Sequence, residues 1–106
     1  MAWVYLFVAG LLEVLWAYTM KQSEGFTRLG PSAMTIVAMI ASVWLLALAM
    51  RTLPLGTSYM VWTGIGAVGA FVVGISVLGE DISAMRIAAA ALIVAGLVLM
   101  KMSSTA

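Results

Sequence analysis

Four long apolar runs dominate this chain and limit what it can fold into. Charged residues make up only 8% of its 106 residues, whereas a soluble domain carries about 25%. A helix needs about 20 apolar residues to cross the hydrocarbon core of a bilayer, and the runs approach or exceed that length. The pattern predicts an all-α integral membrane protein with the lipid bilayer as its solvent.

The residues between the runs suggest where the helices begin and end. Pro31 suits the first turn of the second helix, where the missing N–H of proline would be unpaired in any case. Pro54 and Gly56 predict a tight turn before the third helix, and Asp81 or Ser83 can cap the fourth. We expect one domain over 1–106 with four transmembrane helices near 2–20, 32–50, 57–78 and 84–102.

The composition excludes several classes of function. The chain has no cysteine, so disulfides and thiolate chemistry are ruled out, and it has no histidine, the commonest general base and metal ligand. The net charge of +1 gives no electrostatic reason to expect nucleic acid as a partner. We expect no enzyme activity, no cofactor and no metal site.

Basic residues are almost evenly divided between the two sides of the predicted bundle. With four spans, Lys21, Arg28 and Arg86 share one side, while Arg51 and Lys101 share the other. The positive-inside rule depends on that difference, which is one residue. Either this bias suffices to orient the chain, or the chain inserts both ways and forms an antiparallel dimer, and the sequence leaves both possibilities open.

Glu13 is the only charged side chain inside any of the four runs. It lies about 18 Å along the first helix, near the middle of the bilayer, where an acid costs about 2.5–3.5 kcal/mol on insertion scales. Such an acid is by default a site that exchanges a proton for a cation. The structural alternative is a protonated acid that makes a hydrogen bond between helices.

Other polar and aromatic residues are candidates to line this site. Gly10, Glu13 and Trp16 fall on one stripe of the first helix, although Trp16 also suits an interfacial belt. Ser42, near the centre of the second helix, either bonds the carbonyl four residues earlier, at Ala38, or contributes to the site.

Tyr59 and Trp62 share a face of the third helix, either as site walls or as plain packing. Two stripes of small residues permit close approach between helices, within the chain or between two chains. The first consists of Gly66, Ala70 and Gly74, and the second, which we interpret as a dimerisation surface, contains Ala88, Ala91 and Ala95.

These features together resemble the small multidrug resistance family over the whole length, from Met1 to about Ser103. The specific matches are the first-helix string Gly10 to Ala17, the loop Met20 to Arg28 and the third-helix string Pro54 to Gly66. Within the family, the chain is similar to the branch that exports guanidinium ion. That similarity lies in Trp16-Ala17, Ser42, the string Trp62 to Ala67 and Lys101.

The resemblance implies a proton-coupled antiporter that exports guanidinium by alternating access and lies in the inner membrane of a bacterium. It implies an antiparallel, dual-topology homodimer in which protons and substrate compete for paired Glu13 carboxylates. It further implies that Trp16, Ser42, Tyr59 and Trp62 line the site, with Trp16 and Ser42 bonded to Glu13. Ser58 and Met60 stand where this branch commonly has alanine, so a broader exporter of quaternary ammonium and other hydrophobic cations is the alternative.

Overall fold

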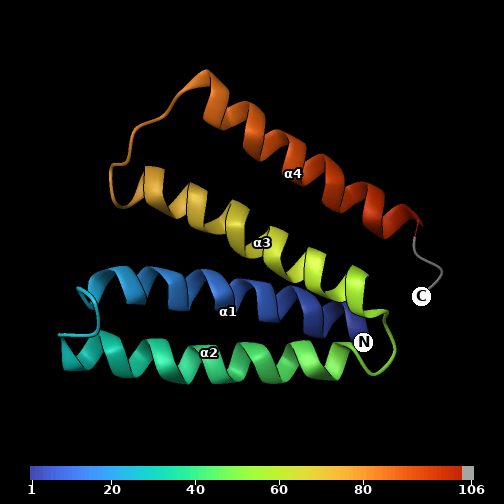
Figure 1. Ribbon diagram of the computed structural model, residues 1–106, viewed down its shortest axis with the longest axis horizontal. Coiled ribbons are helices and arrows are strands. Elements are labelled where there is room, and N and C mark those ends of the chain that lie inside the picture. Colours follow the sequence, from blue (N-terminus) through green and yellow to red (C-terminus); the bar gives the residue numbers. More distant parts are fainter. Residues whose placement is uncertain (104–106) are drawn as a thin grey trace.

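The computed structural model describes residues 1–103, and within them the chain forms four α-helices (Figure 1). These are α1 (Ala2–Gln22), α2 (Leu29–Ala49), α3 (Leu55–Ser76) and α4 (Ala84–Ser103). Consecutive helices run in opposite directions, and all four are long and apolar enough to cross a membrane. The predicted all-α architecture with four transmembrane helices is confirmed.

The helix ends differ from the predicted ends by a few residues, for local reasons. Helix α2 begins at Leu29, three residues early, because Pro31 still falls in the first turn, where no intrahelical N–H is needed. Helix α3 ends at Ser76, and Gly79, at φ +68°, turns the chain away. Of the two predicted caps of α4, Ser83 is the one used, since its hydroxyl accepts the N–H of Arg86 at 3.2 Å.

Helices α1, α2 and α3 form the packed part of the molecule, with α1 against both of the others. Glycines allow α1 and α3 to approach closely. A methyl group on Gly10 would lie 2.5 Å from the Ile65 side chain, and one on Gly69 would collide with Val14. The buried apolar cluster lies toward one end of this unit and consists of Leu6, Ala9, Leu46, Ala49, Leu53 and Val61.

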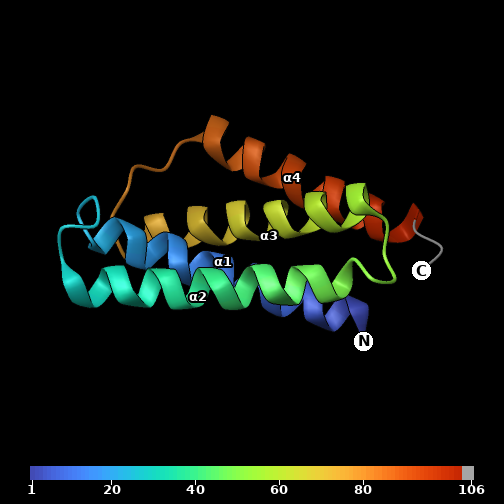
Figure 2. The same cartoon turned by 60° about the horizontal axis from the view of Figure 1, so that its bottom comes forward.

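Helix α4 lies at the edge of this unit and has no buried residue. It packs along α3, where Leu97 covers Gly64 and the Thr57 hydroxyl lies 3.8 Å from the Met100 sulfur. At the same end, the ammonium of Lys101 lies 4.5 Å from the centre of the Trp3 ring of α1. Figures 1 and 2 show α4 farther from α3 at its N-terminal end than at its C-terminal end.

The loops place the charges at two ends of the bundle (Figure 1). Loops 23–28 and 77–83 lie at one end, with three basic residues near them, and they also hold all the acids other than Glu13. The N-terminus, loop 50–54 and the end of α4 lie at the other, with Arg51 and Lys101. The two ends therefore carry the basic residues in the proportion that the sequence predicted.

The close approach of α1 and α3 predicts that Gly10→Ala lowers stability, because the added methyl has no room against Ile65. We expect the apparent melting temperature in detergent to fall by about 5 °C or more, which is the shift that about 1 kcal/mol produces in a domain of this size. Gly96→Ala is the matched control, since a methyl there meets open space and alanine favours the helix. Equal melting temperatures for the two variants would contradict this packing.

Candidate functional site

Glu13 lies in the middle of α1 and directs its carboxyl group at α3. Its Oε1 atom is buried and has no hydrogen-bond partner. The carboxyl group lies over Gly66, where a methyl group would collide with Oε1. Glycine at position 66 therefore creates the space that the acid occupies, and the acid keeps an unused acceptor. An unpaired polar atom in an apolar surrounding is costly, so this oxygen is the strongest candidate for a ligand contact.

Trp16 provides a second unpaired atom close to Glu13 along α1. Its Nε1–H is buried without a partner, and it lies three residues from Glu13 on the same stripe. The resemblance implied hydrogen bonds from Trp16 and Ser42 to Glu13, and the single chain does not contain them. An acceptor and a donor are thus both left available on one face of α1.

Ser42 is fully buried and links three helices. Its hydroxyl donates to the carbonyl of Ala9 on α1 at 2.7 Å. It also accepts the indole N–H of Trp62 on α3 at 3.0 Å. The alternative bond to the Ala38 carbonyl is not formed. Because Ala9 lies one turn before Glu13, this network fixes the helices beside the acid.

Trp62 and Tyr59 continue the wall along α3. Their ring centres are 5.6 Å apart and their planes are tilted by 50°, a geometry that aromatic pairs favour. Trp62 is half-buried and held by Ser42, whereas Tyr59 is 53% exposed. Gly10, the remaining predicted lining residue, is buried against Ile65 of α3. It therefore sets the spacing of α1 and α3 one turn before Glu13.

The two stripes of small residues lie in different environments. Gly66 and Gly74 are buried and Ala70 is half-buried, so the α3 stripe packs within the chain. On α4, Ala90 and Leu97 are half-buried toward α3. The predicted dimerisation stripe lies on the opposite side of α4 by helical spacing, and its members are exposed: Ala88, Ala91 and Ala95.

Sequence reasoning missed two polar features near the site. The hydroxyls of Thr19 and Thr35 lie 2.7 Å apart and join α1 to α2 on the far side of Glu13 from Ser42. Buried Thr and Ser residues at matching depths of neighbouring spans could have indicated this contact. The third buried polar atom without a partner in residues 1–103 is the hydroxyl of Ser58, on α3 one turn before Trp62.

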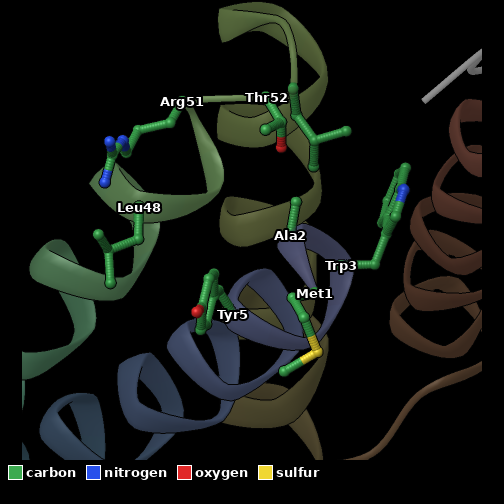
Figure 3. Close-up of a pocket in the computed structure, with 8 residues that line it drawn as sticks. Met1, Ala2, Trp3, Tyr5, Leu48, Arg51 and Thr52 are labelled. Carbon is green, nitrogen blue, oxygen red and sulfur yellow. The ribbon is translucent and has the colours of Figure 1, made fainter.

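A cavity of about 750 Å³ lies at the N-terminal end of α1, beside loop 50–54 (Figure 3). Met1, Trp3, Tyr5 and Arg51 are among its lining residues. Tyr5 is about 12 Å from Glu13 along the helix, so this cavity does not enclose the acid. Glu13 itself is only half-buried, and α1, α2 and α3 form a wall on one side of it.

Four apolar spans, the first of which carries the acid Glu13, define a small multi-pass membrane protein with an intramembrane carboxylate. The model of the Small Multidrug Resistance protein family matches residues 1–93, and the chain belongs to this family. Its bacterial relatives and its four spans place it in the inner membrane.

Three relatives, each named "Guanidinium exporter", align over 104 residues that make up 98% of this chain. They come from Yersinia pseudotuberculosis (58% identical, 100% of its length), Citrobacter freundii (57%, 99%) and Escherichia coli strain K12 (56%, 99%). The resemblance to the family and to its guanidinium-exporting branch is confirmed.

The different roles of the two buried serines can be tested by a matched pair of substitutions. Ser42→Ala removes both hydrogen bonds and leaves the Trp62 indole without its acceptor. We therefore expect the free energy of unfolding in mixed micelles to fall by about 1 kcal/mol. Ser58→Ala removes a hydroxyl that bonds nothing and is expected to be neutral or stabilising. A larger loss for Ser58→Ala than for Ser42→Ala would contradict this assignment.

Proposed function

We propose that this protein is a proton-coupled antiporter that exports guanidinium ion, with Glu13 as the shared site of proton and substrate. The observation that carries the proposal is the buried, unpaired Oε1 of Glu13 within a transmembrane helix. The relatives named as guanidinium exporters supply the substrate. Membership in this family also favours transport over catalysis.

The chemistry of guanidinium suits this wall. The ion is planar and permanently charged, and its N–H groups match the two oxygens of a carboxylate. When Glu13 is protonated it is neutral and stable among apolar groups. When it releases the proton it becomes an acceptor for the cation, so one carboxylate holds either the proton or the substrate. The half-buried faces of Trp16 and Trp62 add cation–π attraction.

We further propose that two chains form an antiparallel homodimer and alternate between openings on either side of the membrane. Glu13 is half-buried and Tyr59 is exposed in the single chain, so a second chain would complete the enclosure. The even distribution of basic residues fits insertion in both orientations. The exposed stripe of small residues on α4 is the surface that we assign to the dimer contact.

Transport by the purified protein in liposomes tests the function. We expect a pH gradient to drive guanidinium uptake in the wild type, because a proton leaves Glu13 as the cation binds. Glu13→Gln cannot release a proton and is expected to abolish coupled transport while the protein remains folded. Glu24→Gln, at an exposed acid in loop 23–28, is the control and should retain uptake. Coupled uptake by Glu13→Gln would disprove the mechanism.

The same assay separates the alternative, a broader exporter of hydrophobic cations. Met60 is 57% exposed beside Tyr59, and methionine adapts its shape to varied partners, which favours some tolerance of alkylated cations. Uptake of tetrapropylammonium at a rate similar to guanidinium would support this alternative. Uptake of guanidinium alone would restrict the substrate to small planar cations.

The assignment of the α4 stripe predicts that Ala91→Leu weakens the dimer, because a larger side chain prevents close approach of two helices. We expect a shift toward monomer of about tenfold in the dissociation constant, roughly 1.4 kcal/mol, measured by energy transfer between labelled chains in bilayers. Ala33→Leu makes the same change at an exposed position of α2 and is the control. Equal dissociation constants for the two variants would exclude this surface.

A further inference from the structure

A cavity of about 190 Å³ lies between α1 and α3, at the end of the bundle that holds loop 77–83. One wall is a stripe of α1 that extends from Val14 to Lys21, and the other is α3 and its following loop, from Ala70 to Glu80. Lys21 and Glu80 lie at the loop end. Val14, at the inner end of the cavity, directly follows Glu13 in the sequence, and Glu13 itself does not line the cavity.

The backbone after α3 holds Glu80 at the loop end of this cavity. The chain turns at Gly79, whose φ of +68° favours glycine, and the N–H of Glu80 then donates to the carbonyl of Gly74 at 2.9 Å. The carboxyl group of Glu80 lies over Gly74, where a methyl group would collide with its Oε1. A buried glycine thus provides a notch for an otherwise exposed acid.

We propose that Glu80 is an entry carboxylate, which binds a small planar cation at the mouth of this cavity before the cation reaches Glu13. The inference rests on the proposed function. Lys21 and Glu13 are eight residues apart, about 12 Å along α1, so a cation held at the mouth would have only a short distance to travel to the intramembrane acid. A negative charge at the mouth of a cleft with apolar walls concentrates cations there.

Lys21 lies at the same mouth and sets the selectivity of this step. Lys21 and Glu80 both line the cavity, so the Lys21 ammonium can compete with an arriving cation for the Glu80 carboxylate. A guanidinium ion can bind both carboxylate oxygens at once, whereas an ammonium group acts as a point charge. The arrangement therefore favours guanidinium over simple monovalent ions. In an antiparallel dimer, one copy of this mouth would face each side of the membrane.

The test measures KM and kcat for guanidinium in liposomes at low and high salt. For Glu80→Gln we expect KM to rise by about tenfold at low ionic strength with kcat almost unchanged, because the capture of the cation weakens but Glu13 is intact. The difference should largely disappear in about 1 M sodium chloride, where the Debye length is about 3 Å. A purely structural role for Glu80 would not give this salt dependence.

Two further variants test whether the position of the Glu80 carboxylate matters, or only the presence of negative charge in the loop. Gly74→Ala keeps Glu80 but expels its carboxyl group from the notch, so KM should rise in the same direction, and the double variant should be no worse than Glu80→Gln alone. Asp81→Asn removes the neighbouring acid, which is not part of the cavity wall, and should raise KM clearly less than Glu80→Gln does, because its charge attracts the cation only from a distance. Neither acid-to-amide change alters the number of Lys and Arg residues that orient the chain.

The outcomes distinguish this inference from the function on which it rests. A wild type that transports guanidinium, together with an unchanged KM in Glu80→Gln, would overturn the entry site and leave the function intact. An equal rise in KM for Asp81→Asn would also overturn it, since any loop charge would then serve. A wild type that does not transport guanidinium would overturn both.

Discussion

The contact between the carboxyl group of Glu13 and the backbone at Gly66 is the constraint on which the rest of the structure depends. An acid at this depth cannot be left facing lipid without a large free-energy cost. Placing α1 against both α2 and α3 gives the acid protein neighbours. The absence of a side chain at Gly66, and the close approach at Gly10, then leave the acid room without opening a gap in the packing.

The polar groups around the acid divide into two sets with different physical roles. The Ser42 hydroxyl is satisfied by the Ala9 carbonyl and the Trp62 indole, and such a network fixes the relative positions of three helices. The Oε1 of Glu13 and the Nε1 of Trp16 have no partner. A rigid frame that holds unsatisfied groups is preorganised for a ligand, because the cost of ordering these groups has already been met during folding.

The sequence was sufficient to predict the four spans and the depth of the acid, and it limited the cap of α4 to Asp81 or Ser83, because these features depend on local composition and spacing. It did not determine the partner of Ser42. The carbonyl four residues earlier and a carbonyl on a neighbouring helix satisfy a serine equally well, and the choice depends on how α2 is rotated against α1. The contact of Gly66 with Glu13 was missed for the same reason, since helix rotation is a property of the packed bundle.

Helix α4 uses one of its sides within the chain and leaves the other exposed. The half-buried residues Ala90 and Leu97 mark its contact with α3, while the small residues on its opposite side are exposed. Small side chains give little packing energy against lipid but allow two helices to approach closely. A helix that uses only one side within the chain and keeps its small residues on the other is suited to the contact that we propose with a second chain. Because the wall around Glu13 is also one-sided, the second chain that we propose would complete both features.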